Sequence, residues 1–301
     1  MSATTKRKGR GKAQASLDLI EASHQILAEI QPASIRAICY RLFVKGLLVS
    51  MAKTETNKVS KQLVYAREQG IIPWEWVVDE TRELERAGTW NNPEQIISAA
   101  VRSYRRDYWQ DQSAHVEVWS EKGTVRGTVA PVLQEYGVNF RAMHGFTSAT
   151  VVNNIAEESA ASAKPWVIFY VGDYDPSGMY MSDVDLPGRL TRYGGKVTMR
   201  RIALLQSDTV SLPSFDAETK VKDNRHAWYC ERYGQRCWEL DAMPPPLLRQ
   251  RVEQEIRRCI DMERWERAVE VERAETDSMR SFMAAWQSNL RLATNSAGGR
   301  P

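Results

Sequence analysis

The apolar run from Trp166 to Val171, followed at once by Gly-Asp-Tyr-Asp-Pro-Ser-Gly, constrains the fold more than any other feature of this chain. An apolar run of this length that ends in turn-forming residues predicts a buried strand. Asp173 and Asp175 then stand at its carboxyl end, where open parallel sheets assemble their binding sites. The alternate spacing of the two carboxylates allows both to approach one divalent cation.

A third carboxylate occupies a matching place upstream. Residues 115–120 alternate as a strand does, and Glu121 follows them directly. Three carboxylates suit Mg²⁺, which takes oxygen ligands, keeps several waters and neutralises a phosphodiester during in-line displacement. The sequence therefore predicts a magnesium site formed by Glu121, Asp173 and Asp175.

Three other interpretations of the Asp-x-Asp segment stay open. An EF-hand loop begins in the same way, but Val184 replaces its final Glu and Pro176 lies inside the loop. Phosphatases of the haloacid dehalogenase type use one such aspartate as nucleophile, but Ser177 replaces their usual Thr or Val and no convincing acidic pair follows. The third is a solvated loop, since Asp, Pro, Ser and Gly are ordinary turn formers.

Strand and helix patterns alternate from residue 115 onward. The segments are residues 115–120, 124–136, 139–143, 149–160 and 166–171. This alternation predicts an α/β lobe with a mostly parallel, Rossmann-like sheet. After Trp238 the chain becomes proline-rich and then charged and helical to about residue 292, which predicts a helical C-terminal extension.

The N-terminal part carries three helical patterns and a short extended segment. Apolar spacing predicts helices at 16–30, at 34–46 and at about 56–69, and then a short strand pair or wing at 71–78. This order is typical of a winged helix-turn-helix domain, which commonly lays one helix in the DNA major groove. A plain three-helix packing module is the alternative. The basic residues of the third helix that would contact DNA are Lys58, Lys61 and Arg67.

Tyr40 occupies a distinctive position on the second predicted helix. With about 100° per residue counted from Ile35, the other apolar residues cluster near zero, whereas Tyr40 falls at about 140°. Tyr40 is therefore expected off the core face. Arg36 precedes it by four residues, so we expect the guanidinium beside the phenol, where it would bind a phosphate oxygen and favour the phenolate.

The overall charge says little about partners. The chain has 41 Lys and Arg against 38 Asp and Glu, a net charge of +3, so any affinity for nucleic acid must come from local clustering. The clearest cluster contains Lys6, Arg7 and Lys8 among glycines, which is typical of a disordered basic tail. Such a tail would track DNA or simply be solvated.

The sequence also bears on the compartment. Its uncharged apolar stretches are far shorter than the roughly twenty residues of a membrane helix, and no apolar run follows the N-terminal basic residues. We therefore expect no membrane partner and a cytoplasmic location. The four cysteines lack CxxC spacing and are expected as free thiols. His226, Cys230 and Cys237 resemble part of a zinc site but have no fourth ligand nearby.

The acidic motifs resemble those of a known domain. Glu121 after one strand, and Asp173-x-Asp175-Pro-x-Gly178 after another, resemble the TOPRIM domain of topoisomerases, primases and nucleases. The Asp-Pro-x-Gly ending is similar to the topoisomerase VI A subunit and to its relative that makes meiotic double-strand breaks. Both place a winged-helix domain before the TOPRIM domain. The short length resembles the compact Mini-A relatives of phages, plasmids and bacterial genomes.

The second predicted helix carries a further part of this resemblance. In these families the winged helix has a catalytic tyrosine in an Arg-x-x-x-Tyr motif, which Arg36 and Tyr40 match here. Two positions depart from the family pattern. Cys39 replaces the first tyrosine of the usual Tyr-Tyr pair, and Ala37 replaces the acid after the arginine.

The resemblance implies a mechanism. Tyr40 would attack a phosphodiester of double-stranded DNA to form a 5′-phosphotyrosyl link, with Mg²⁺ held by the three carboxylates. Family members act as homodimers in which each tyrosine meets the acids of the partner subunit. The chain has no GxxxxGK[ST] loop, so strand passage would need a separate ATPase subunit. The alternatives are a TOPRIM nuclease that hydrolyses DNA without a covalent intermediate, and a catalytically silent DNA-binding protein.

These patterns divide the chain into five predicted parts. They are a basic tail at 1–15, a winged-helix domain at 16–88, a helical connector at 89–112, a TOPRIM domain at 113–240 and a helical extension at 241–301. The predicted fold class is α/β.

Overall fold

The structure, a computed structural model, describes residues 13–78, 89–143 and 148–297, and for residues 290–297 it describes the helical backbone alone. Lys6, Arg7 and Lys8 of the predicted basic tail lie outside the described residues. The chain divides into two compact units. Met1–Thr81 and Val116–Ile256 form the first, and Arg82–His115 and Arg257–Pro301 form the second.

Three helices begin the first unit. They are α1 (Gln14–Ile30), α2 (Ile35–Val44) and α3 (Lys53–Glu68). The Ser34 side chain caps α2 by accepting a hydrogen bond from the backbone N–H of Ala37. Their apolar faces share one core, in which Leu27, Ile38 and Leu63 are fully buried. The three helices predicted from apolar periodicity are therefore present.

The segment after α3 differs from the predicted strand pair. It contains a short 3₁₀ helix, η1 (Trp74–Trp76), and a two-residue strand, β2 (Val77–Val78). This strand pairs in parallel with β1 (Ala33–Ser34), the residues just before α2. Residues 71–78 therefore form no hairpin of their own. Residues 79–88, the rest of the predicted winged-helix domain, lie outside the described residues.

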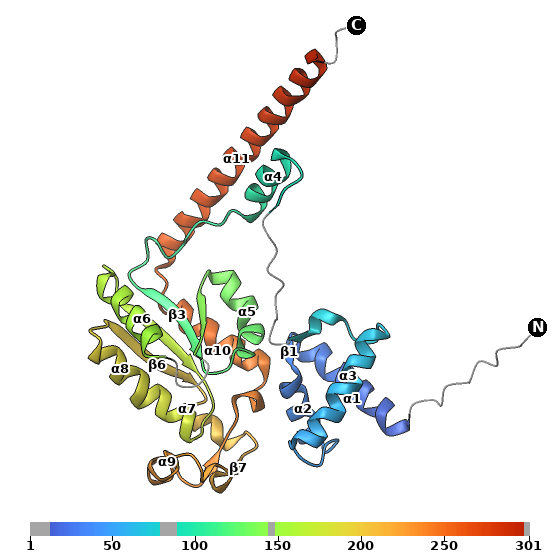
Figure 1. Ribbon diagram of the computed structural model, residues 1–301, viewed down its shortest axis with the longest axis vertical. Coiled ribbons are helices and arrows are strands. Elements are labelled where there is room, and N and C mark those ends of the chain that lie inside the picture. Colours follow the sequence, from blue (N-terminus) through green and yellow to red (C-terminus); the bar gives the residue numbers. More distant parts are fainter. Residues whose placement is uncertain (1–12, 79–88, 144–147, 298–301) are drawn as a thin grey trace, which may run out of the picture. The chain divides into compact units, whose positions relative to one another are not determined.

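A four-stranded parallel sheet, with helices packed around it, forms the second part of the first unit (Figure 1). Its strands are β3 (His115–Ser120), β4 (Asn139–Ala142), β5 (Trp166–Val171) and β6 (Val197–Ala203), in the order β4-β3-β5-β6. The helices between them are α5 (Val125–Tyr136), α6 (Ala149–Ala161), α7 (Pro176–Tyr180) and α8 (Leu186–Arg192), with a π-helical turn, η2 (Met181–Asp185). The predicted α/β class with a parallel sheet is confirmed.

The helices α6 and α8 cover one face of this sheet. Ile155 of α6 and Leu190 of α8 share a buried core with Trp119, Ile168 and Tyr170 from the strands β3 and β5. These large apolar side chains lie on one face because strand residues two apart point the same way. The core holds the ends of β3 and β5, and therefore the acidic residues after them, on a rigid base.

The rest of the first unit follows β6. It contains η3 (Gln206–Val210), β7 (Phe215–Asp216), η4 (Ala217–Lys220), α9 (His226–Tyr233), β8 (Arg236–Cys237), η5 (Leu240–Ala242) and α10 (Pro245–Arg257). The strands β7 and β8 are antiparallel. Arg249 of α10 donates hydrogen bonds to the carbonyls of Ile30 and Thr128, at 3.2 and 3.3 Å. It thereby ties the end of α1 to α5.

The second unit pairs two helices from distant parts of the sequence. They are α4 (Pro93–Ser103) and the long α11 (Met262–Ala297), which lie side by side. Tyr104 donates a hydrogen bond of 2.6 Å to Glu275, and the backbone N–H of Arg106 donates one of 2.8 Å to Glu272. Residues 89–112 were predicted as a connector, and the structure packs them against the C-terminal helix.

The helices and the cysteines of the structure bear on the expected absence of a membrane span and on the expected free thiols. Within the described residues, no helix combines the length and the apolar character that crossing a membrane requires. All four cysteines are free thiols, of which Cys39 and Cys237 are buried. The Cys230 Sγ lies 3.4 Å from the His226 Nε2, one turn away on α9.

Candidate functional site

The strand order creates a switch point between β3 and β5. From β3 the chain crosses to β4 on one side, and from β5 it crosses to β6 on the other, so the order reverses between these two neighbours. Ligands of open α/β sheets bind outside the carboxyl ends of the strands at such a point. Glu121 follows β3 by one residue, and Asp173 follows β5 by two. The three acids predicted from the sequence thus follow neighbouring strands at one edge of the sheet, and the charges of Asp173 and Asp175 act on Glu121.

The loop that carries the aspartates is held by the start of α7. Asp175 is buried and caps this helix by accepting a hydrogen bond of 2.7 Å from the Gly178 N–H, while Pro176 occupies the first helical position. A Cβ at Gly178 would lie 2.4 Å from the carbonyl oxygen of Asp173. The close approach of the two backbone segments therefore requires glycine at this position.

Arg201 of β6 forms hydrogen bonds to the same loop. Its Nη1 donates to the carbonyl of Gly172 at 3.0 Å, its Nη2 to the carbonyl of Gly178 at 2.6 Å, and its Nε to the Ser182 hydroxyl at 2.9 Å. A guanidinium offers five N–H donors in a planar fork, which suits carbonyls that converge from several directions. One side chain thus fixes both ends of the Asp173–Gly178 turn.

Two lysines neutralise the aspartates. The Lys122 Nζ lies 2.9 Å from the Asp173 Oδ2, and the Lys220 Nζ lies 3.2 Å from the Asp175 Oδ2. The backbone N–H of Leu240 also donates to the Asp173 Oδ1 at 2.8 Å. Burial and the negative charge of Asp173 raise the pKa of Asp175. Burial and the charges of Asp173 and Asp175 likewise raise the pKa of Glu121, so this cluster of acids favours a nearby positive charge.

The donor chemistry of this cluster fits a hard cation. Carboxylate oxygens are the ligands that Mg²⁺ prefers, and mutual repulsion among three carboxylates is relieved by a divalent ion. Within the part of the chain that the structure describes, no three His, Cys, Asp or Glu side chains already surround one point as metal ligands. Lys122 and Lys220 instead form ion pairs with Asp173 and Asp175. A metal that binds these aspartates would have to displace the two ammonium groups.

Tyr40 is buried although it stands apart from the apolar core of the three helices. Its exposed fraction is 6%, and it is not a member of the core that contains Ile38 and Leu42. The Arg36 guanidinium carbon lies 5.9 Å from the centre of its ring, so the predicted neighbour is in place. The pKa of the Tyr40 phenol is nevertheless raised, first by burial and then by Glu239, and Arg36 only partly offsets these effects. Arg36 therefore acts on the phenol in the expected direction, but burial and the charge of Glu239 outweigh its effect.

Two acids that the sequence patterns did not assign complete the site. Glu239 forms an ion pair with Arg36, and the Asp241 Oδ2 lies 3.6 Å from the Arg36 Nε. The Ser34 hydroxyl donates a hydrogen bond of 3.1 Å to Asp241. The sequence shows Glu239 and Asp241 on either side of Leu240. No local pattern connects them to Arg36, which lies 203 residues before Glu239.

Lys122 connects these acids to the predicted metal ligands. Its Nζ lies 2.9 Å from Asp173, 3.4 Å from Asp241 and 3.7 Å from Glu239. Burial opposes the charge of this lysine, but the three carboxylates together raise its pKa. The ammonium group therefore stays charged and joins the acidic loop to the partners of Arg36.

Comparisons with protein-family models, with curated proteins and with solved structures found no match to this chain. The geometry of the site therefore carries the functional argument.

A small cavity opens beside Arg36. It encloses about 280 Å³ between α2, α3 and the start of α5. Its lining is rich in hydroxyl and amide groups and comprises Ser34, Ile35, Arg36, Cys39, Thr56, Asn57, Ser60 and Thr124. Neutral hydrogen-bonding side chains next to one arginine are suited to a phosphate-bearing strand.

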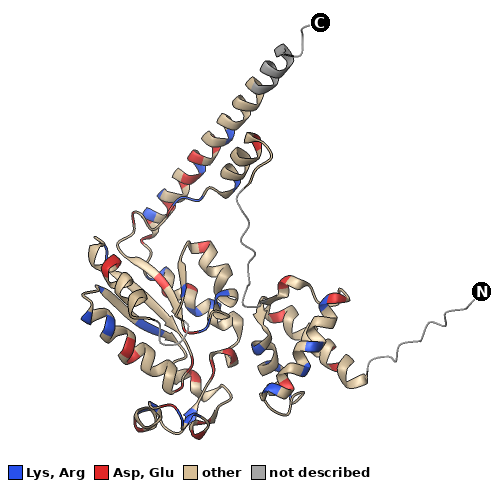
Figure 2. Ribbon diagram, in the orientation of Figure 1, with Lys and Arg blue, Asp and Glu red and all other residues tan. Residues whose placement is uncertain are grey.

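The predicted DNA-contacting residues of α3 have different surroundings. Lys58 has an exposed side chain paired with Glu55 at 2.5 Å, and Lys61 is exposed. Arg67 is buried, and its guanidinium lies 4.8 Å above the Trp74 ring, which favours a packing role over contact with DNA. Figure 2 shows acidic and basic residues interspersed over both units, in keeping with the small net charge.

Proposed function

We propose that this chain is a magnesium-dependent DNA-cleaving transesterase of the topoisomerase VI A-subunit type, with Tyr40 as nucleophile. The observation that carries the proposal is a continuous series of ion pairs from Arg36, one turn before Tyr40, through Asp241 and Lys122 to Asp173. This series links the helix of the tyrosine to the acidic loop of the same chain within one unit, and in the proposed dimer this arrangement would present the tyrosine of one copy to the acids of the other. The winged-helix and TOPRIM assignments belong to the same proposal.

In the proposed reaction the Tyr40 oxygen attacks phosphorus and the bond to the 3′-oxygen breaks. The phenol gives up a proton and the leaving 3′-oxygen gains one, so a 5′-phosphotyrosyl link and a free 3′-hydroxyl result. Mg²⁺ held by Glu121, Asp173 and Asp175 would supply positive charge beside the phosphate and the leaving oxygen. The covalent link keeps the energy of the phosphodiester for resealing.

Arg36 has to change partners in this scheme. Its guanidinium is paired with Glu239 and Asp241, and a DNA phosphate would compete with these carboxylates for the same donors. Release of Glu239 from Arg36 leaves the guanidinium to neutralise the phosphate that Tyr40 attacks. The hydroxyl-rich cavity beside Arg36 provides a path by which a strand would approach.

The test uses negatively supercoiled plasmid with Mg²⁺, stopped with detergent and divided into samples with and without protease. We expect nicked or linear DNA whose ends are freed from protein only by protease. Tyr40→Phe should abolish the covalent adduct and leave DNA binding unchanged, because it removes only the nucleophilic oxygen. Adducts that persist in Tyr40→Phe would remove this residue from the mechanism.

A hydrolytic TOPRIM-type nuclease is the second candidate. It is favoured by the burial of Tyr40 and by the raised pKa of its phenol, both of which oppose nucleophilic attack. In this case water attacks the phosphate at the acidic site and Tyr40 plays no chemical part. Protein-free ends in the plasmid assay, equally abundant with Tyr40→Phe, would support this candidate. A protein that binds DNA without cutting it would leave the plasmid intact.

The proposed partners are double-stranded DNA and a second copy of this chain. Two copies related by a two-fold axis present two tyrosines to the two strands, which yields a staggered double-strand break. Strand passage would also require a separate ATPase subunit. A cytoplasmic setting in a bacterium, phage or plasmid-bearing cell is part of the same proposal.

A further inference from the structure

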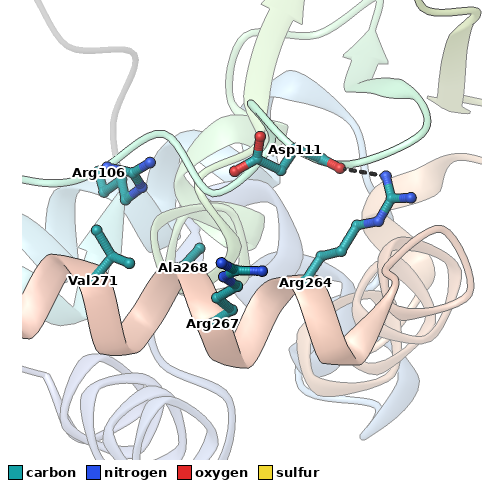
Figure 3. A pocket seen from close by; sticks show the side chains of 6 residues that line it. All are labelled: Arg106, Asp111, Arg264, Arg267, Ala268 and Val271. Atoms are coloured by element: carbon teal, nitrogen blue, oxygen red, sulfur yellow. Dashed lines mark hydrogen bonds between the residues drawn. The ribbon is translucent and has the colours of Figure 1, made fainter.

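The second unit contains a cavity that the proposed cleavage site does not use. It encloses about 520 Å³ and lies between α11 and the segment that follows α4. Figure 3 shows that Arg264, Arg267, Ala268 and Val271 come from the helix, and that Arg106 and Asp111 come from the segment that crosses it. Three guanidinium groups thus surround the cavity with one carboxylate.

Two of the arginines are held in place by the protein. The Arg264 Nη1 donates to the backbone carbonyl of Asp111 at 2.8 Å, and its Nε lies 3.3 Å from Asp261. The Arg106 Nη1 donates to Glu275 at 2.9 Å. These contacts orient both side chains before any ligand arrives, which lowers the entropy cost of binding.

A guanidinium N–H donor at the cavity has no acceptor within the described part of the chain. The Nε of Arg106 is buried and has no hydrogen-bond acceptor. Arg267 has no ion pair among the residues that the structure describes, and its side chain lies at the cavity. Buried N–H groups are seldom left without an acceptor, so the Arg106 Nε indicates a missing oxygen ligand. The buried Ala268 adds an apolar wall.

The aromatic residues next to this cavity are already engaged with one another. The rings of Tyr108 and Trp109 meet the Trp265 ring edge-on, with centroids 4.7 and 6.1 Å apart. These three rings thus pack against one another beside the cavity. The three guanidinium groups of the cavity offer N–H donors that suit phosphate oxygens.

We propose that this cavity binds a backbone phosphate of DNA, independently of base sequence. Planar guanidinium groups match the oxygens of a phosphate, and their charge favours a polyanion that displaces bound counterions. The proposal rests on the proposed function only for the identity of the ligand as DNA. A free phosphate compound has the same oxygens and is the alternative source of the group.

The test compares Arg267→Gln with Arg273→Gln in the full-length chain. Both arginines lie exposed on α11 and neither has an ion pair among the described residues, but only Arg267 lines the cavity. Binding of a fluorescent DNA duplex is measured by anisotropy over a range of salt concentrations without Mg²⁺. We expect Arg267→Gln to weaken binding severalfold and to reduce the slope of log K against log salt by about 0.9, because one phosphate contact is lost.

The control should behave like the wild type in both affinity and salt slope. Equal effects of the two substitutions would overturn the proposal, because loss of one positive charge would then explain both. Thermal unfolding with added pyrophosphate separates the two sources. If pyrophosphate raises Tm for the wild type but not for Arg267→Gln, and duplex affinity is unchanged, the site takes free phosphate compounds and the DNA assignment is wrong.

This outcome is separable from that of the cleavage proposal. Loss of duplex affinity in Arg267→Gln supports the cavity even when the plasmid assay gives no covalent adduct. Adducts that depend on Tyr40, together with unaltered binding by Arg267→Gln, support the cleavage proposal and refute the cavity.

Discussion

At the scale of single residues, the pairing of Arg36 with Glu239 has the largest consequence for chemistry. The same carboxylate that holds the guanidinium also raises the pKa of the Tyr40 phenol. The described arrangement therefore keeps the tyrosine neutral and the arginine occupied. In the proposed reaction, DNA would replace Glu239 as the partner of Arg36.

Gly178 provides a residue-scale test of the acidic loop. In Gly178→Ala the new Cβ would meet the Asp173 carbonyl oxygen at 2.4 Å, and a backbone atom cannot move aside as a flexible side chain does. We expect a loss of unfolding free energy of about 1–3 kcal/mol and strongly reduced metal-dependent cleavage. Urea unfolding and the plasmid assay measure the two effects.

Gly188→Ala is the matched control for this substitution. Gly188 lies in α8, and a Cβ there would meet no atom within 4 Å. Alanine in place of glycine within a helix should stabilise by up to about 1 kcal/mol and leave cleavage unchanged. Similar losses in both variants would show that the close approach at Gly178 has no special importance.

At the scale of secondary structure, the edge strand β6 supports the site through one side chain. Arg201 reaches from this strand to the carbonyls at both ends of the acidic loop, whereas the neighbouring Arg200 pairs with Glu255 on α10. Successive residues of a strand point to opposite faces, so the two arginines serve different neighbours. Of these two arginines, Arg201 is the one that donates to backbone carbonyls of the acidic loop.

Substitution of these two arginines should separate their contributions. Arg201→Met removes the hydrogen bonds of a buried guanidinium to the carbonyls of Gly172, Asp173 and Gly178, and we expect the unfolding free energy to fall by about 2–4 kcal/mol. Arg200→Met removes a half-exposed ion pair and should cost less than about 1 kcal/mol. Urea denaturation checks both values, and equal costs would contradict the supporting role of Arg201.

At the scale of the whole molecule, the proposed reaction requires two copies of the chain. A single tyrosine cuts one strand, and a two-fold symmetric pair presents one tyrosine to each strand. The resemblance to topoisomerase VI A subunits implies that each tyrosine works with the acids of the other copy. This implication can be tested without knowledge of the dimer interface.

Co-expression of Tyr40→Phe and Asp175→Asn chains provides that test. Asparagine is chosen because it can still cap α7. Each variant alone should form no covalent adduct, but a mixed dimer would join the tyrosine of one chain to the intact acids of the other. We therefore expect nicked plasmid with protein-bound ends from the mixture only. An inactive mixture would show that Tyr40 works with the acids of its own chain.

Local patterns in the sequence predicted much of the fold. The strands expected at 115–120 and 166–171 have those bounds, and the helix expected at 124–136 is Val125–Tyr136. Apolar periodicity and turn-forming residues act over a few positions, so a sequence displays them directly. The strand β6 was not predicted, because its exposed edge carries arginines and offers no continuous apolar run.

The sequence by itself also placed Glu121, Asp173 and Asp175 at one edge of the sheet, since each follows a strand and parallel strands end at one edge. Only the tertiary structure decided which residues surround them. Glu239 reaches Arg36 across 203 positions, and the residues after α4 line the arginine cavity with α11. No local pattern encodes such pairs, because ion pairs between distant segments depend on how the helices and the sheet pack.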